Sequence, residues 1–330
     1  MPTLADIAKK AGVSTAVVSR IMNNDGSLRV SKETRARVHK VIEETGYTPN
    51  RSARSLRKTE TGMLALVVHD VTNPVYAEIM KGAHAAATEA GKAILLVDAA
   101  AGKPALEHVV GLIRGRGVDG IVLQAAEENA DLMIAQAARE NVPIVLLQAQ
   151  FENSLPVVAL QDRKAAWIAT NHLIERGHTK IACLATRKGL SFTNERIAGW
   201  KDALKAAGHA SPSDYVIHCD PSIEDGADIV NSLFGLSVRP TAVVCCNVLS
   251  AIGAMHCAIE LGYDVPSDIA FVAIHDIPLA QYCSIPLTAV ETPLHELGKS
   301  AVERLLHPLP QQTAALLVPT SPKLIHRESS

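Results

Sequence analysis

Hydrophobic runs alternate with helical patterns along most of the chain. From residue 63 the run MLALVV precedes a helical pattern over 75–90, and AILLVD, DGIVLQ and PIVLLQ follow with helical patterns between them. The alternation resumes at KIACLA, YVIHC, TAVVCC and IAFVAI. Repeated strand–helix units are typical of parallel sheets. Since about 260 residues are too many for one hydrophobic core, the pattern predicts an α/β body of two similar lobes.

The first 46 residues show a different pattern, that of three short amphipathic helices. Thr3 opens a sequence that resembles a capping box, and Gly12 suits the left-handed turn that ends a helix. Ser14 is placed to cap a second helix, and Ser31 to cap a third helix that stops at Gly46. Two helices joined by a short turn containing glycine form a helix-turn-helix unit, whose second helix enters the major groove of DNA.

Small and cationic side chains occupy the outer face of the second helix. Thr15 can donate or accept a hydrogen bond, Ala16 can touch a thymine methyl group, and Arg20 can bind guanine through two hydrogen bonds. Ser14 and Ser19 are better suited to phosphates, which set position but not sequence. The alternative is a three-helix packing unit with no DNA partner.

Charge is unevenly distributed along the chain. Residues 1–60 hold 12 Lys and Arg against 6 Asp and Glu, a balance of +6, whereas the remainder holds 20 against 28, a balance of −8. A basic head on an acidic body favours a polyanionic partner for the head, although a solvated basic surface would give the same balance. Together with the helix-turn-helix pattern, the charge points to DNA.

The segment YTPNRSARSLRKTETG, residues 47–62, follows the three helices. Pro49 stops the third helix, and Asn50 can cap a short cationic helix from Arg51 to Lys58. Leu56 is the one large apolar residue of that helix, which is too short to be stable alone. One apolar side chain on a basic segment suits a wedge between base pairs in the minor groove, and the alternative is a disordered linker when DNA is absent.

Composition limits the remaining possibilities. Of the 330 residues, 48% are hydrophobic but only 3% are aromatic, so the core must be aliphatic. The six cysteines form no C-x-x-C pair and are interpreted as reduced thiols of a cytoplasmic protein. Neither a signal peptide nor a membrane span is expected, and no metal site is expected. GRGVDG, residues 115–120, fits G-x-G-x-x-G but precedes a strand instead of following one, so no nucleotide cofactor is expected.

Five segments carry a family pattern: TLADIAKKAGVSTAVVSRIMNN, VSKETRARVHKVIEETGYTPNRSARSLR, VVHDVTNPVYAEIMKGAHAAA, NERIAGWKDALKAAG and HDIPLAQYCSIPLTAVETPLHELGKSAVERLL. Together they resemble the lactose/galactose repressor (LacI/GalR) family of bacterial transcription regulators, from about residue 2 to residue 327. The resemblance implies a helix-turn-helix domain over 1–46, a hinge segment over 47–61 and a two-lobed body like a periplasmic binding protein over 62–330. Lobe one is expected at about 62–160 and 291–319, and lobe two at about 161–290 and 320–330.

The same resemblance implies a homodimer, sometimes a tetramer, on a near-palindromic operator in double-stranded DNA. No apolar heptad tail follows residue 327, which favours the dimer. By motif position, Leu56 falls on the family's intercalating leucine, Ala53 on the contact between two hinge helices, and Asn50 on the start of the hinge. The predicted DNA contacts are Thr3, Ser14, Thr15, Ala16, Ser19, Arg20, Asn23, Asn50, Ala53, Arg54 and Leu56.

Ligands of such sheets bind at the carboxyl ends of the strands, in the crevice between the lobes. The candidate effector contacts are therefore the residues that follow the strands: His69, Asp70, Asn73, Val75, Tyr76, Gln124 and Gln148 on lobe one, and Asp162, Phe192, Arg196, Asn247, His275 and Asp276 on lobe two. By family position, Arg196 grips effector hydroxyls or carboxylates. Two structural alternatives stay open, namely that Arg196 pairs with an acid and that Asp162 caps the helix it precedes.

Two departures from the family pattern bear on the effector. Val248 stands where most sugar-responsive members have Asp, and His275 stands where they have the first Asp of an Asp-Asp pair. Losing two carboxylates that accept hydrogen bonds from sugars makes an ordinary neutral hexose less expected. With Arg196 and Gln148 beside His275, the hypothesis at this point is an anionic effector such as a sugar acid or phosphosugar.

The sequence therefore predicts a ligand-responsive transcription regulator, usually a repressor, switched by a small metabolite in the interlobe cleft. The alternatives are a solute-binding protein for transport and an enzyme on a Rossmann-like body. A basic head and the absence of a signal peptide argue against the first, and the absence of a cofactor fingerprint or nucleophile motif argues against the second.

Overall fold

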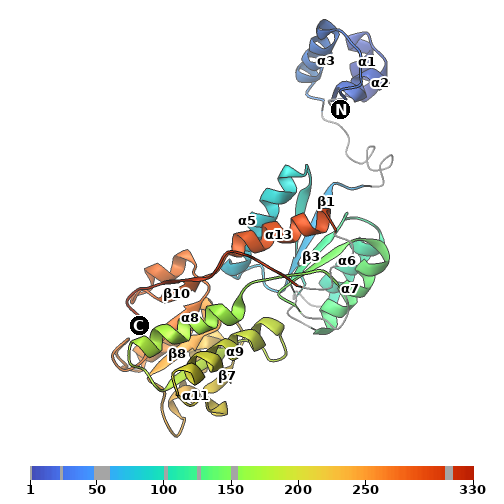
Figure 1. Ribbon diagram of the computed structural model, residues 1–330. Helices are drawn as coiled ribbons and strands as arrows, with labels where there is room; N and C mark the ends of the chain where they lie inside the picture. The colour runs from blue at the N-terminus through green and yellow to red at the C-terminus, as the bar shows by residue number, and fades with distance from the viewer. Residues whose placement is uncertain are drawn as a thin grey trace. The chain divides into compact units, whose positions relative to one another are not determined.

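The structure is a computed structural model that describes residues 2–22, 25–47, 60–99, 103–124, 128–149, 155–308 and 315–330 (Figure 1). The chain divides into two compact units, Met1–Thr61 and Gly62–Ser330. Asn23, Asn50, Ala53, Arg54 and Leu56, together with most of the expected hinge segment, lie outside the described residues.

The first unit contains the three expected helices, α1 (Leu4–Ala11), α2 (Thr15–Met22) and α3 (Lys32–Thr45). Thr3 and Asp6 form the capping box at α1, and Gly12 ends that helix in the left-handed conformation with φ of 65°. The apolar faces of the helices meet in one small core, which includes Ile7, Val18 and Val38. Local capping signals and helical periodicity thus suffice to specify this unit.

Lobe one of the second unit is a six-stranded sheet in the order β11-β5-β4-β3-β1-β2, and all its described pairings are parallel. Its strands are β1 (Met63–Val68), β2 (Ala93–Asp98), β3 (Ile121–Gln124), β4 (Ile144–Leu147), β5 (Val157–Ala159) and β11 (Leu316–Leu317). Helices α5 (Pro74–Glu89) and α13 (Leu294–Leu306) lie on one side of the sheet, and α6 (Lys103–Arg114) and α7 (Glu128–Asn141) lie on the other (Figure 1).

Lobe two repeats the arrangement with the order β12-β10-β9-β8-β6-β7. Its strands are β6 (Ile181–Ala185), β7 (Val216–His218), β8 (Ala242–Cys245), β9 (Ala270–Ile274), β10 (Thr288–Glu291) and β12 (Lys323–Ile325). Its helices are α8 (Asp162–Glu175), α9 (Ser191–Ala206), α10 (Ile223–Asp228), α11 (Val230–Phe234) and α12 (Val248–Glu260), with the 3-10 turns η1 (Ser213–Tyr215) and η2 (Pro278–Tyr282). The two parallel-sheet lobes and the N-terminal helices confirm the predicted fold class.

The chain passes between the two sheets three times: from β5 to α8, from β10 to α13, and from β11 to β12. The last crossing returns β12 antiparallel to β10, with Val290 opposite Leu324. That antiparallel edge was not anticipated, because β12 is only three residues long and has no helix after it to indicate its direction.

Glycines bring the covering helices into close contact. A Cβ atom on Gly82 of α5 would stand 1.8 Å from the His295 carbonyl oxygen of α13, and one on Gly298 would stand 1.9 Å from the Ile79 oxygen. The same reciprocal contact joins Gly226 of α10 and Gly253 of α12. These helix pairs therefore pack backbone against backbone, which fixes where each helix crosses its partner.

Candidate DNA-binding surface and ligand cavity

The N-terminal turn of α2 is open to solvent. Ser14, Thr15 and Ala16 are exposed, whereas Val18 and Ile21 on the opposite side are completely buried. The Ser14 hydroxyl accepts a hydrogen bond from the Val17 amide at 3.3 Å, as expected for a helix cap.

Arg20, at the other end of the same face, is held by its own unit. Its Nε donates to Asp25 Oδ2 at 2.8 Å and its Nη2 donates to Ser27 Oγ at 2.8 Å. Hydrogen bonds from Ser27 and from Arg20 lower the pKa of Asp25 to about 2. Asp25 is therefore a carboxylate near neutral pH, and Arg20 must exchange this anion for any other partner.

Thr3 and Ser19 contribute less accessible groups. The Thr3 hydroxyl donates to Asp6 Oδ2 at 2.7 Å within the capping box, and Ser19 is half-buried on α2. Thr3 is exposed, however, and it lies at the N-terminus of α1, where backbone N–H groups and the helix dipole favour anions. The structure thus leaves Thr3 in a position compatible with a phosphate contact.

Between the lobes lies a cavity of about 280 Å³. The carboxyl ends of strands from both sheets surround it, as expected for doubly wound sheets. Its walls are formed by His69, Asp70, Asn73, Val75, Tyr76, Gln124, Gln148, Thr186, Arg187, Leu190, Phe192, Arg196, Asp220, Pro221, Ser222, Asp225, Asn247 and His275. Every candidate effector contact except Asp162 and Asp276 is on that wall.

Arg196 of α9 is buried and already fully engaged by the protein. Its Nε donates to Asp162 Oδ1 at 2.7 Å, and its Nη2 lies 2.6 Å from the same oxygen. Its Nη1 donates to the Cys246 carbonyl oxygen, and its Cζ stands 5.0 Å from the centre of the Phe192 ring. The ion pair with Asp162 therefore compensates the guanidinium charge, as the structural alternative for Arg196 requires.

Asp162 lies behind the cavity wall. Besides Arg196, it accepts a hydrogen bond from Gln148 Nε2 at 3.1 Å, and the carboxylate is 4% exposed. It is the first residue of α8, and its side chain bonds to these two partners from lobe one and lobe two. In this position Asp162 can influence a ligand through Gln148 and Arg196.

His275, which follows β9, has both ring nitrogens occupied. Nε2 is 2.9 Å from Arg196 Nη2, and Nδ1 is 2.6 Å from Thr292 Oγ1. Because a guanidinium only donates hydrogen bonds, Nε2 must accept, so Nδ1 carries the proton and donates to Thr292. Burial, and secondarily the charge of Arg196, holds the pKa of His275 well below 6.5, which makes the ring neutral.

Two asparagines on the wall also cap helices. The Asn73 Oδ1 accepts from the Val75 amide at 3.1 Å, and the Asn247 Oδ1 accepts from the Leu249 amide at 2.8 Å. Each cap fixes the asparagine side chain at the N-terminus of its helix, beside the cavity. The NH2 group is then the donor that each amide can offer to a ligand.

The aromatic and imidazole groups complete the lobe-one wall. Tyr76 is half-buried at the start of α5, and burial is the main reason that the pKa of its hydroxyl rises to about 12. His69, at the end of β1, has its Nε2 2.7 Å from Asp131 Oδ1 on α7, and both side chains are almost fully buried. Tyr76 therefore stays protonated and can both donate and accept.

Several wall residues were missed by the sequence interpretation. Arg187 donates to both oxygens of Asp220, from Nε at 2.6 Å and from Nη2 at 3.1 Å, and this pair lowers the pKa of Asp220. Thr186 and Arg187 follow β6, and Asp220 to Ser222 follow β7, so the rule that placed the other residues also applies to them. The strand runs KIACLA and YVIHC were identified in the sequence, but their following loops were not used.

The comparisons with known proteins agree with this architecture over nearly the whole chain. Residues 3–50 match the family described as bacterial regulatory proteins, lacI family, and residues 61–325 match periplasmic binding proteins and sugar binding domain of LacI family. The chain belongs to the LacI family of bacterial transcription regulators. Its members are DNA-binding regulators, not enzymes.

Relatives of known role share about a third of their residues with this LacI-family protein. The HTH-type transcriptional repressor CytR of Escherichia coli (strain K12) is 33% identical over 92% of this chain and 89% of its own length. The regulator GalR of the same strain is 33% identical over 100% and 96%, and its ribose operon repressor is 30% identical over 95% and 94%.

Solved structures of the family match this chain over nearly its whole length. A complex of the regulator CelR with cellobiose has a TM-score of 0.75 at 28% identity and covers 100% of both chains. The lac repressor dimer bound to operator and the anti-inducer ONPF has a TM-score of 0.83 at 25% identity, covering 99% of this chain and 98% of its own. No helix among the described residues of this LacI-family protein is long and apolar enough to cross a membrane.

Proposed function

We propose that the protein is a repressor that binds a near-palindromic operator as a homodimer and is switched by a neutral, hydroxyl-rich metabolite in the interlobe cavity. The observation that carries the ligand class is the charge compensation of the wall. Arg196 is paired with Asp162 and Arg187 with Asp220, while His275 is neutral. The two deeply buried groups, Arg196 and His275, thus present no uncompensated positive charge, the half-exposed Arg187 is paired with Asp220, and Asp70 and Asp225 add negative charge.

This charge distribution disfavours an anionic effector. That hypothesis depended on Arg196 and His275 acting as cations towards the ligand, and neither is available in that role. A sugar acid or phosphosugar would face carboxylates in a partly buried site, where repulsion is weakly screened. Hydroxyl groups, by contrast, can donate to the carboxylates and accept from the amides of Asn73 and Asn247.

The DNA-binding part of the proposal rests on the exposed N-terminal turn of α2 and on the excess of cations in the first 60 residues. Thr15, Ala16 and Arg20 are proposed to read bases, and Ser14, Ser19 and Thr3 to contact phosphates. Asn23, Asn50, Ala53, Arg54 and Leu56 remain sequence-based proposals for the operator contacts of the turn and hinge. The domain limits of 1–46, 47–61 and 62–330 belong to the same proposal.

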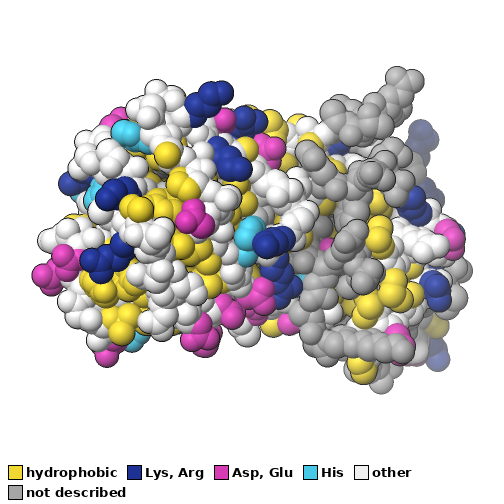
Figure 2. All heavy atoms as spheres, turned by 90° about the horizontal axis from the view of Figure 1, so that it is seen from below, with side chains coloured by type: hydrophobic (Ala, Val, Ile, Leu, Met, Phe, Trp, Pro, Cys, Tyr) yellow, Lys and Arg dark blue, Asp and Glu magenta, His cyan; other side chains and the backbone are white. Residues whose placement is uncertain are grey.

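The homodimer is supported by apolar side chains that the second unit leaves in contact with solvent. On η2, Tyr282 is 76% exposed and Leu279 is 48% exposed, so this turn offers apolar surface to a second copy of the chain. Figure 2 shows hydrophobic side chains reaching the surface of the body among charged ones. A solved relative is described as a repressor dimer bound to operator. Light scattering should give a mass twice the 35.1 kDa of one chain.

A thermal-shift screen tests the ligand class directly. The panel contains D-ribose, D-galactose, cellobiose, uridine, gluconate and glucose 6-phosphate, and a cavity ligand should raise the melting temperature by mass action. We expect the shift from one of the four neutral compounds. A shift from gluconate or glucose 6-phosphate alone would contradict the neutral-ligand proposal. A protein that binds a panel compound but shows no sequence-specific DNA binding would instead fit a solute-binding protein.

A further inference from the structure

His275 occupies a position between the ligand cavity and the connections that join the two lobes. Its ring is on the cavity wall, yet its Nδ1 donates to Thr292, which directly follows β10 where the chain crosses to lobe one. Its backbone amide donates to the Val290 carbonyl oxygen at 3.0 Å. The backbone of His275 has a φ of 73°, a conformation that non-glycine residues rarely adopt, so these contacts must hold it there.

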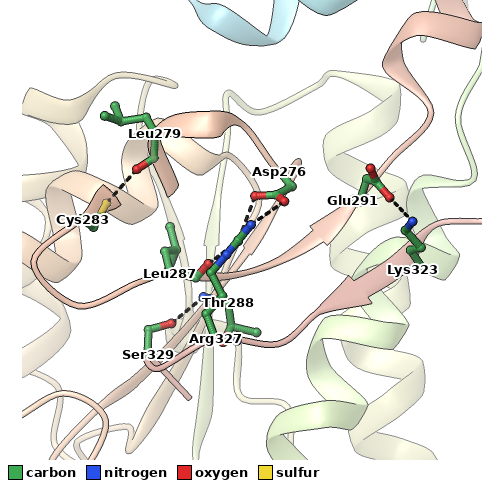
Figure 3. Close-up of polar contacts among 9 residues, drawn as sticks. All are labelled: Asp276, Leu279, Cys283, Leu287, Thr288, Glu291, Lys323, Arg327 and Ser329. Carbon is green, nitrogen blue, oxygen red and sulfur yellow. Dashed lines mark hydrogen bonds and ion pairs between the residues drawn. The ribbon is translucent and has the colours of Figure 1, made fainter. Parts of the chain in front are cut away.

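The residue after His275 is anchored to the C-terminal segment, just beyond the third connection between the lobes. Asp276 accepts two hydrogen bonds from Arg327, from Nη1 at 2.9 Å and from Nη2 at 2.7 Å (Figure 3). Arg327 follows β12, the strand that re-enters lobe two, and its Nη1 also donates to the Leu287 carbonyl oxygen at 2.7 Å. Its backbone amide donates to Thr288 Oγ1 at 2.9 Å.

On the Nε2 side of the His275 ring, a series of hydrogen bonds reaches lobe one. Arg196 donates to His275 and to Asp162, and Asp162 accepts from Gln148, which follows β4 of lobe one. A continuous chain of buried hydrogen bonds therefore runs from lobe one, past the cavity wall, to the connection at Thr292. Buried polar groups joined in this way are costly to leave unpaired, so a displacement at one end changes the preferred arrangement at the other.

We propose that Thr292 is a positioning residue that holds the His275 ring against Arg196 and thereby couples occupancy of the cavity to the angle between the lobes. The Arg327–Asp276 pair keeps the loop at residue 275 in place for that contact. This inference rests on the proposed ligand-controlled function, because it specifies how the cavity communicates with the rest of the protein.

Paired substitutions of Thr292 test the inference in the ligand-free, full-length protein. Thr292→Val keeps the shape but removes the acceptor for Nδ1–H, and Thr292→Ser restores a hydroxyl. Nitrogen-15 NMR of labelled histidines should show well-separated Nδ1 and Nε2 signals for His275 in the wild type, assigned by their loss in His275→Gln. The separation should shrink in Thr292→Val as the ring proton is shared between the Nδ1–H and Nε2–H tautomers, and it should return in Thr292→Ser. An unchanged separation in Thr292→Val would mean that Arg196 alone holds the ring, and would overturn the proposal.

The Arg327–Asp276 pair is tested with a neighbouring ion pair as its control. Arg327→Lys keeps the charge but cannot make two parallel hydrogen bonds, so it should shift the same His275 signals. Lys323→Met removes the more exposed pair that joins Lys323 of β12 to Glu291 of β10 (Figure 3), and it should leave those signals in place. Equal effects of both substitutions would show that any disturbance of this edge of the sheet shifts the His275 signals. That result would contradict the specific role proposed for Arg327.

The functional readout uses the same six compounds as the thermal-shift screen. For whichever compound changes DNA affinity in the wild type, that change should fall at least five-fold in Thr292→Val and recover in Thr292→Ser, with ligand-free DNA affinity preserved. A wild-type response in Thr292→Val would overturn the coupling role. If none of the six compounds changes DNA affinity, the proposed function is what fails, and the NMR experiment still decides the position of His275.

Discussion

Arg20 and Arg196 are both paired with an aspartate, but in environments that give the pairs different consequences. Arg20 is about half exposed and its hydrogen bonds to Asp25 and Ser27 can exchange for others in water. Arg196 is buried, so separating it from Asp162 would leave two uncompensated charges in the protein interior. Arg20 is therefore suited to reversible binding of a partner such as DNA, and Arg196 is suited to a permanent ion pair inside the protein.

Replacing Asp25 with Asn should increase DNA affinity about three- to ten-fold at low salt. The substitution releases Arg20 from its anionic partner and removes a negative charge beside the proposed phosphate contacts. Glu44→Gln makes the same change of charge on α3, away from Arg20, and serves as the control. Fluorescence anisotropy with a promoter duplex would measure both. Equal gains for the two variants would mean that only net charge matters.

Folding stability should decrease as the pH falls from about 6.5 towards 4, in part because of His172 on α8. Burial, together with the charges of His326 and Arg176, lowers the pKa of His172 to about 4. Between pH 6.5 and about 4 the unfolded chain binds a proton at His172 that the folded chain does not bind. The contribution of His172 to the free energy of unfolding is therefore present above pH 6.5 and is lost as the pH falls below it. His275 and His178 also have lowered pKa values and act in the same direction.

His172→Phe should flatten that part of the pH profile, because phenylalanine keeps the ring but cannot bind a proton. Urea unfolding at pH 7 and pH 5 measures the difference between the two stabilities. The variant should lose less stability than the wild type on acidification. An identical loss would show that His172 does not cause this dependence.

Which residues face the cavity could be predicted from the sequence, but what they do there could not. The rule that ligands meet the residues following parallel strands correctly brought together Asn73, Gln124, Asn247 and His275. The partner of Arg196 is 34 residues away along the chain, and the Thr292 contact of His275 is 17 residues away. Such pairings depend on the tertiary fold, so the charge that each residue presents to the cavity could not be inferred from residue types alone.

At the scale of the elements, close crossings of helices determine the shape of each lobe. Gly82 and Gly298 allow α5 and α13 to touch along their backbones, so any side chain at these positions must push the helices apart. The hydrophobic periodicity predicted that α5 exists and where it begins. It did not predict this crossing, because α13 follows more than 200 residues later, beyond the reach of a local pattern.

Gly82→Ala should lower the free energy of unfolding by about 1–3 kcal/mol, the usual cost of overpacking a tight contact. Gly111→Ala on α6 is the matched control, since that glycine is exposed and has nothing within 4 Å of the added methyl group. There alanine should raise stability by about 0.5–1 kcal/mol through helix propensity. Chemical denaturation of both variants tests the contrast, and destabilisation in both would argue against the contact.

The hinge segment carries one large aliphatic residue, Leu56. Leu56→Ala should weaken operator binding about ten-fold or more, because a methyl group cannot replace a wedge between base pairs. Affinity for the cavity ligand should hardly change, since residue 56 precedes the unit that contains the cavity. Leu56→Met, which keeps the bulk, should retain most of the binding. Unaltered operator affinity in Leu56→Ala would rule out the wedge.

At the scale of the whole molecule, most of the architecture was accessible from the sequence. Alternating strand and helix patterns predicted both lobes, and the capping residues predicted the three N-terminal helices. The antiparallel β12 was not predicted, because the direction of a three-residue edge strand is fixed by its pairing with β10. The sequence motifs also indicated a regulator of the LacI family, which the comparisons confirm.

Selection from a random duplex library tests whether the dimer recognises a specific DNA sequence. The full-length protein is incubated with the library at several ionic strengths, and the retained duplexes are sequenced after successive rounds. We predict that the wild-type protein enriches a near-palindromic site. Arg20→Ala should no longer select that site, and the two half-sites of any sequence that it selects should change together. Retention of random duplexes without an enriched sequence at any ionic strength would contradict this prediction.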